Sequence, residues 1–300
     1  MRLLSLFPLI LMTKSYSRFL GVAGVLLATT GSVRAQVAND TIPVDKHQYK
    51  LFNPTPRKYM RPLVPDRPGI TDSPYTVDAG HFQLEDDGFR LINGRQRGSH
   101  EREFYVNHML LKLGLTDKTD VQLQVESYIV DKQWQDSGND SPLRQAGFGD
   151  LTLRVKRNIV GDDNKPFALA VLGLVRMPTG HNVGEGGTEL GLSVPVVYKL
   201  PHHWNVGGQV AGVWSYDRET SSHYSQLTPT LTVDREFAKW LEGFVELVGY
   251  WDMRGAAWRT SVNLGPQFDI GDNLQIDFGT HIALDRQTDH EYFIGFSFRR

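Results

Sequence analysis

Hydrophobic and polar positions alternate along most of the chain after residue 78, in segments separated by clusters of Gly, Asp, Asn and Pro. In residues 204–216, Trp204, Val210 and Trp214 share one parity, whereas Gln209 falls on the other. Because successive side chains of a β-strand point to opposite faces of the sheet, this segment predicts a strand with one apolar and one polar face. Similar segments predict twelve strands, at residues 81–92, 103–115, 121–134, 148–159, 167–177, 189–200, 204–216, 224–234, 241–251, 257–270, 274–285 and 291–299.

The alternation fails in two of these predicted strands. In the strand at residues 241–251, Phe244 lies on the same face as Glu242, so both face the polar side if Glu242 does. In the strand at residues 167–177, Leu172 likewise shares the polar face with Arg176. A β-bulge would explain the conflict by reversing the faces partway along a strand. A partly apolar interior would explain it equally well, and the pattern leaves both explanations open.

The apolar faces of the strands could contact either a protein core or lipid. A soluble β-sandwich also alternates, but links of alternating length and aromatic residues near strand ends are typical of an outer-membrane barrel. We therefore predict an all-β fold, a transmembrane antiparallel β-barrel of about 12 strands with a Pro-rich N-terminal arm. The expected interfacial aromatic residues are Trp204, Trp214, Tyr216, Trp251 and Trp258.

Hydrophobic runs after residue 35 are too short for membrane helices. The longest, residues 167–175, has nine residues, whereas a membrane helix needs about 20. An open sheet edge cannot form its hydrogen bonds in lipid. A membrane location therefore requires a closed barrel.

The N-terminal region predicts export and a short arm. Residues 1–35 carry four basic and no acidic residues, include an apolar run and end in small residues before Ala35. This pattern predicts a signal peptide cleaved after Ala35 rather than an uncleaved membrane anchor. Translation could start at either Met1 or Met12. Seven prolines between residues 36 and 78 predict an extended, poorly packed periplasmic arm. The expected division is residues 1–35, 36–78 and 79–300.

Charge and cysteine content exclude several classes of function. The chain contains no cysteine, so thiol catalysis and disulfides are excluded. Without residues 1–35, it carries 28 basic and 34 acidic residues, a net charge of −6. A mildly acidic exported protein is a poor candidate for binding nucleic acid.

No set of side chains converges on a catalytic or metal-binding motif. His202 and His203 adjoin in a predicted turn, where their side chains point apart, so a solvated turn is favoured over a metal site. His281 shares a face with Asp277, and a hydrogen-bond network inside the barrel is favoured there over a catalytic pair. We expect no enzymatic activity, no catalytic residue, no metal and no cofactor.

The polar faces would line the lumen of the barrel. Their charges have both signs, which argues against strong ion selectivity and favours pairs across neighbouring strands. Twelve strands lie between the side-chain-filled barrel of about eight and the open barrel of about sixteen, so any passage should be narrow. The candidate lumen-lining residues are Glu85, His108, Lys112, Glu126, Asp150, Arg154, Lys156, Arg176, Lys199, Gln209, Glu242, Glu246, Arg259, Asp277 and His281.

Three stretches carry a family resemblance. They are Asp66-Arg67-Pro68-Gly69-Ile70-Thr71-Asp72-Ser73-Pro74-Tyr75-Thr76-Val77, residues 147–156, and residues 177–180 with 184–189. Together they resemble a family of bacterial outer-membrane barrels assigned to a MetA pathway of phenol degradation or to transport, in which the first stretch leads into the first strand. The resemblance implies the outer membrane of a Gram-negative bacterium, with lipid, the barrel-assembly machinery and a small-molecule solute as partners. It also implies a role in moving hydrophobic or aromatic compounds.

These observations favour one function and leave two alternatives. We expect a passive outer-membrane channel or uptake protein for small solutes, including hydrophobic or aromatic ones. The first alternative is a structural or adhesive envelope barrel whose lumen is plugged by the Pro-rich arm. The second is an exported soluble sandwich that binds a ligand. The solute, the direction of transport and the oligomeric state do not follow from the sequence.

Overall fold

The computed structural model describes residues 45–96, 99–135, 142–161, 165–255 and 258–300. The expected signal peptide and both candidate start sites lie outside the described residues. Residues Val44–Arg300 form one compact unit. Within the described residues, no helix is both long and apolar enough to cross a membrane.

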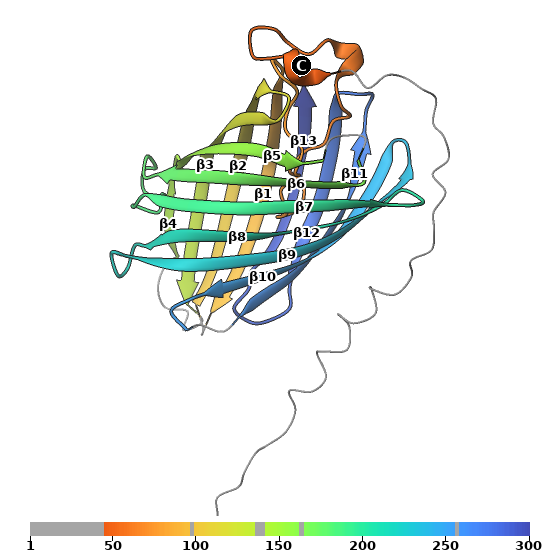
Figure 1. Cartoon of the computed structure of the whole chain (residues 1–300). Coiled ribbons are helices and arrows are strands. Elements are labelled where there is room, and N and C mark those ends of the chain that lie inside the picture. Colours follow the sequence, from red (N-terminus) through yellow and green to blue (C-terminus); the bar gives the residue numbers. More distant parts are fainter. Residues whose placement is uncertain (1–44, 97–98, 136–141, 162–164, 256–257) are drawn as a thin grey trace, which may run out of the picture. The chain divides into compact units, whose positions relative to one another are not determined.

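The described strands form a closed antiparallel barrel (Figure 1). β2 pairs with both β1 and β3, and β13 pairs with β1, so the sheet closes on itself. β4 and β5 both pair with β3 and together fill one strand position, which gives the twelve positions that the alternation predicted. The strands are β1 (Phe82–Gln96), β2 (Ser99–Thr116), β3 (Thr119–Gln135), β4 (Leu143–Gly147), β5 (Leu151–Val160), β6 (Phe167–Met177), β7 (Glu189–Leu200), β8 (Trp204–Asp217), β9 (Ser222–Ala238), β10 (Leu241–Asp252), β11 (Arg259–Asp269), β12 (Leu274–Ala283) and β13 (His290–Arg299).

The two faces of the strands have opposite chemistry. Val210 is 54% exposed on the outer face, whereas its neighbour Gln209 is buried inside. Glu246 and Asp277 are also fully buried on the inner face. A soluble protein would bury its apolar face instead, so this distribution is the one expected of a wall between lipid and a polar lumen.

The two irregular strands have a partly apolar inner face. Phe244 and Leu172 are buried. The pairing of β10 with β11 has no shift, and the shift between β10 and β9 lies between Leu241 and Glu242, so Glu242 and Phe244 stay on the same face. A bulge therefore does not explain the inward position of Phe244, and the lumen is apolar at this point.

Residues 61–78 do not have the poor packing that the proline content of residues 36–78 predicted. Two short 3₁₀-helices, η1 (Lys46–Gln48) and η2 (Arg57–Tyr59), lie at the end of the barrel that carries the short turns, where Leu51 donates its backbone N–H to Leu115. Residues 61–78 then enter the barrel, and Asp66, Tyr75 and Asp78 are buried. Figure 1 shows this part of the chain in orange at the barrel mouth.

Candidate functional site in the barrel lumen

Residues 61–78, called the lumen loop below, enter and leave the barrel at the same mouth. Near its start, Arg61 Nη2 donates to the backbone oxygen of Asp117, in the turn after β2, at 3.0 Å. Near its end, the N–H of Val77 donates to Asp120 at the start of β3, at 2.9 Å. Between these points the loop reaches the wall opposite, where Gln209 Nε2 donates to the oxygen of Ile70 at 2.8 Å.

Asp66 anchors the loop to two lysines of the wall. Its carboxylate lies 2.6 Å from Lys112 Nζ on β2 and 2.6 Å from Lys156 Nζ on β5. It also accepts the N–H of Ser73 at 2.8 Å, which ties the two limbs of the loop together. Burial by itself raises the pKa of Asp66, but the charges of Lys112 and Lys156 outweigh it and hold the pKa well below its usual value.

Arg67 pairs with acidic residues of the wall, whereas Asp66 pairs with basic ones. Its guanidinium contacts the carboxylates of Asp87 on β1 and Asp277 on β12, with Nε 2.9 Å from Asp277 Oδ2. Burial opposes the charged form, yet the two carboxylates hold the pKa of Arg67 above its usual value. Arg67 and Asp66 are adjacent in the chain and pair with opposite charges of the wall. A rotated or shifted loop would break both pairs.

The tip of the loop is held by a buried carboxylate. Glu246 on β10 accepts the N–H of Ile70 at 2.9 Å and the N–H of Thr71 at 2.7 Å. Asn263 donates to the same carboxylate at 2.8 Å. A Cβ atom at Gly69 would lie 3.1 Å from Glu246 Oε2, so a residue without a side chain lets the tip approach this closely.

A second loop is fixed near the opposite end of the barrel. Asp150, at the break between β4 and β5, accepts the N–H groups of Gly180 and Glu185 at 2.8 Å each. These donors belong to residues 178–188, which join β6 to β7. Arg176 pairs with Glu126 at 3.1 Å beside them. Burial raises the pKa of Glu185, despite the nearby Arg176.

The candidate lumen-lining residues lie on the inner face, but many of their partners belong to the loop rather than to neighbouring strands. Lys112, Lys156 and Asp277 pair with the loop, as does Arg154, which contacts Asp72. His108 contacts Asp87, and His281 Nδ1 lies 3.1 Å from Glu291. Whether any of these residues contacts a solute stays a prediction. Among the remaining candidates, Glu85 lies beside Lys112, Lys199 over the ring of Tyr75 and Arg259 over the ring of Tyr250, and Glu242 lines a cavity beside the loop.

Sequence reasoning missed Asp66, Arg67 and Asp72 as lumen residues. The signal that could have found them is their charge within a Pro- and Gly-rich stretch, because an extended polar segment beside a barrel can satisfy buried charges of the wall. The expected interfacial residues Trp204, Trp214 and Trp258 are 37%, 49% and 50% exposed, and the rings of Trp251 and Trp258 stack with centroids 5.7 Å apart. Their contact with a lipid boundary is not tested by the fold.

One group of carboxylates among the described residues could hold a metal ion. Atoms of Glu101, Glu103 and Asp131 lie within 4.8 Å of one another near the longer loops. The amide of Gln133 already donates to Glu101 and Asp131, at 2.8 and 3.0 Å. Exposed acidic groups are common without a metal, and Glu103 also accepts a hydrogen bond from Tyr105 at 2.9 Å, so the group by itself does not identify a metal site.

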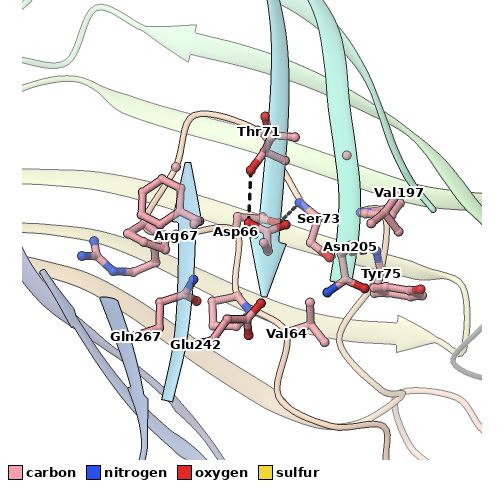
Figure 2. A pocket seen from close by; sticks show the side chains of 18 of the residues that line it. Val64, Asp66, Arg67, Thr71, Ser73, Tyr75, Val197, Asn205, Glu242 and Gln267 are labelled. Atoms are coloured by element: carbon pink, nitrogen blue, oxygen red, sulfur yellow. Dashed lines mark hydrogen bonds between the residues drawn. The ribbon is translucent and has the colours of Figure 1, made fainter. Parts of the chain in front are cut away.

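A cavity of about 560 Å³ remains between the lumen loop and the wall (Figure 2). The loop contributes apolar side chains that include Val64 and Tyr75, and the wall contributes Glu242, Phe244 and Gln267. The loop therefore narrows the lumen and leaves a space beside it.

Comparisons with known proteins place the chain among outer-membrane barrels. A family model described as "Putative MetA-pathway of phenol degradation" matches residues 65–298. An outer-membrane channel from Pseudomonas putida F1 is similar in structure, with a TM-score of 0.57 and 14% identity over 78% of this chain and 99% of that one. The KdgM porin covers 72% of this chain and 98% of its own at a TM-score of 0.44 and 10% identity, and the NanC porin covers 70% and 98% at 0.44 and 14%. The first of these similarities shows the shared fold. No curated protein sequence matched significantly.

Proposed function

The chain belongs to the family described as the MetA pathway of phenol degradation, and we propose that it is a passive outer-membrane channel for small solutes. In this proposal the lumen loop is the constriction, and solutes pass beside it. The short-turn end would face the periplasm, as is usual for outer-membrane barrels. Residues 1–35 would act as the cleaved export signal.

The observation that carries the proposal is a polar lumen narrowed by a fixed loop with space beside it. A barrel that served only as a membrane anchor would need no wall of buried charges, because burying a charge is costly unless it is paired. Here Asp66 and Arg67 compensate the wall charges while the cavity of about 560 Å³ stays unfilled by side chains. That space is in the range of small-molecule sites.

We extend the proposal to aromatic solutes. Tyr75 and Phe244 line the cavity, and both are buried. Flat rings in a narrow space favour other aromatic rings by offset or edge-to-face contact. The family description is consistent with such cargo.

A structural barrel with a plugged lumen is the second candidate function, because the loop is tied to the wall by several charge pairs. The two candidates predict different behaviour in a bilayer. A channel passes ions and small solutes with the loop in place, whereas a plugged barrel is silent.

Purified full-length protein in planar bilayers and in proteoliposomes would separate them. The channel proposal predicts discrete conductance steps, and swelling in isosmotic L-alanine and L-phenylalanine but not in raffinose, which is too large for a narrow passage. Protein-free liposomes are the control for leakage. Silent bilayers together with absent swelling would refute the channel and favour the plugged barrel.

A further inference from the structure

The cavity beside the lumen loop has two unlike walls. The loop side carries charged residues that are paired with the wall, such as Asp66 and Arg67, and an apolar part that includes Leu63, Val64 and Tyr75. The barrel side carries acidic residues from adjacent strands, Asp234 on β9 and Glu242 on β10 among them. Figure 2 shows Val64, Tyr75, Glu242 and Gln267 around this space.

Some carboxylates on the acidic side of the cavity have no basic partner among the described residues. Within the described part of the chain, Asp234, Glu242 and Asp269 form no ion pair. Asp234 accepts only from Thr232 Oγ1, at 3.1 Å, and Asp269 accepts from Gln275 Nε2, at 3.1 Å.

The basic groups that line the cavity already have other contacts. Arg67 is paired with Asp87 and Asp277. His203 Nδ1 lies 3.4 Å from Glu236, and Lys199 Nζ lies 4.9 Å from the centre of the Tyr75 ring. None of these basic groups is therefore paired with Asp234 or Glu242 on the opposite wall.

Two buried amides point to the same conclusion. Gln267 is only 8% exposed, and its side chain forms no hydrogen bond with any residue that the structure describes. Gln275 is 3% exposed and leaves Oε1 without a partner among those residues. Both line the cavity. Buried amide groups are normally hydrogen-bonded, so the unpartnered Oε1 of Gln275, beside the free amide of Gln267, is suited to a donor that enters the cavity.

We propose that this cavity binds a small organic cation, with an ammonium or amidinium group against Glu242, Asp234 and Gln267 and an apolar body against Val64 and Tyr75. Carboxylates favour a positive charge that can also donate hydrogen bonds. The apolar loop side favours a hydrocarbon or aromatic body, which would gain by leaving water.

A bare metal ion fits this cavity less well. Among the described residues, the one group of acidic side chains with metal-ligand spacing is Glu101, Glu103 and Asp131, which does not line the cavity. A molecule with its charge at one end and a body about the length of an aromatic ring can contact both walls.

Binding in this cavity is a property separate from passage through the barrel. It is measured on protein in detergent and holds whether or not the barrel conducts. A failed conductance experiment would therefore refute the channel alone, and a failed binding experiment would refute the cation site alone.

Calorimetric titration of the full-length protein tests the site, with benzylammonium as the probe and benzyl alcohol as its uncharged counterpart. We expect benzylammonium to bind at least about tenfold more tightly, because a paired, hydrogen-bonded charge contributes about this much. Glu242→Gln should weaken benzylammonium binding about tenfold without changing the affinity for benzyl alcohol. Glu219→Gln, an exposed change in the turn between β8 and β9, should leave both unchanged.

Asp234→Asn on the neighbouring strand provides a second variant if Glu242→Gln does not fold, and heat-modifiability on a gel reports folding for each. Equal affinity of the two probes for the unaltered protein would overturn the proposal without any variant. So would the absence of benzylammonium binding, or unchanged binding in the folded variants.

Discussion

Lys156 of the barrel wall lies 2.6 Å from the carboxylate of Asp66, a residue 90 positions earlier in the chain. Lys156 is fully buried, so its ammonium depends on this carboxylate for compensation. The N-terminal segment is therefore part of the interior of the barrel rather than an appendage to it. Buried charges of the wall are neutralised by opposite charges of the loop.

Replacing Asp66 should loosen the loop. Asp66→Asn removes the carboxylate between Lys112 and Lys156, which leaves the buried ammonium of Lys156 uncompensated while Lys112 keeps Glu85. Breaking a buried ion pair in this way costs about 3–5 kcal/mol. We expect a lower free energy of unfolding in denaturant titrations and a larger conductance, because the constriction becomes mobile.

Asp272→Asn is the matched control for this change. Asp272 is exposed in the turn between β11 and β12. The substitution therefore changes the net charge by the same amount, but it removes no carboxylate that neutralises a buried ammonium group. It should leave stability and conductance unchanged. Equal effects of the two substitutions would mean that Asp66 acts only through net charge.

The Asp66 anchor should be insensitive to mild acid. The pKa of Asp66 in the folded protein lies well below the usual value of an aspartate carboxyl group. A group with a lowered pKa contributes its stability fully above the unfolded value and loses it only as the pH falls through the folded value. The destabilisation caused by Asp66→Asn should therefore be the same at about pH 7 and pH 5. A difference that shrinks towards pH 5 would show that Asp66 becomes protonated in that range.

The assignment of faces predicts that Val210 and Gln209 respond differently. Val210→Lys places a charge on the outer face near the middle of β8, which costs about 2–4 kcal/mol at the centre of a bilayer and should reduce the heat-modifiable, folded fraction. Val210→Leu should assemble normally. Gln209→Ala should also assemble, but it removes the hydrogen bonds to Ile70 and Asp72 and should loosen the loop. Normal assembly of Val210→Lys together with failure of Gln209→Ala would mean that the faces are reversed.

The alternation predicted the barrel well because the face of a strand is a local property. Residues 167–177 and 189–200 were predicted as strands with the bounds that β6 and β7 have. Residues 148–159 were predicted as one strand, and β5 spans Leu151–Val160. The prediction missed β4, which lies in the predicted link before it and is separated from β5 where Asp150 turns inward to hold the second loop.

The lumen loop could not be predicted in the same way, because its partners are far away in the sequence. Arg67 and Asp277 are separated by 210 positions. Alternation shows which way Asp277 points but not what it contacts. The proline content of residues 61–78 predicts a stiff, extended backbone, but it does not show that this segment lies inside the barrel. The charges of the wall were therefore assigned to one another, when many of them belong with the loop.

The central claim, that residues 61–78 form the constriction of a channel, is tested most directly by single-channel recording with a thiol reagent. Thr71 lies at the tip of the loop and lines the cavity, and the chain has no cysteine of its own. In Thr71→Cys, we predict that a positively charged methanethiosulfonate lowers the current in discrete steps, whereas unaltered protein and an exposed Glu219→Cys control stay unaffected. An unchanged current in Thr71→Cys protein that mass spectrometry shows to be modified would contradict the account.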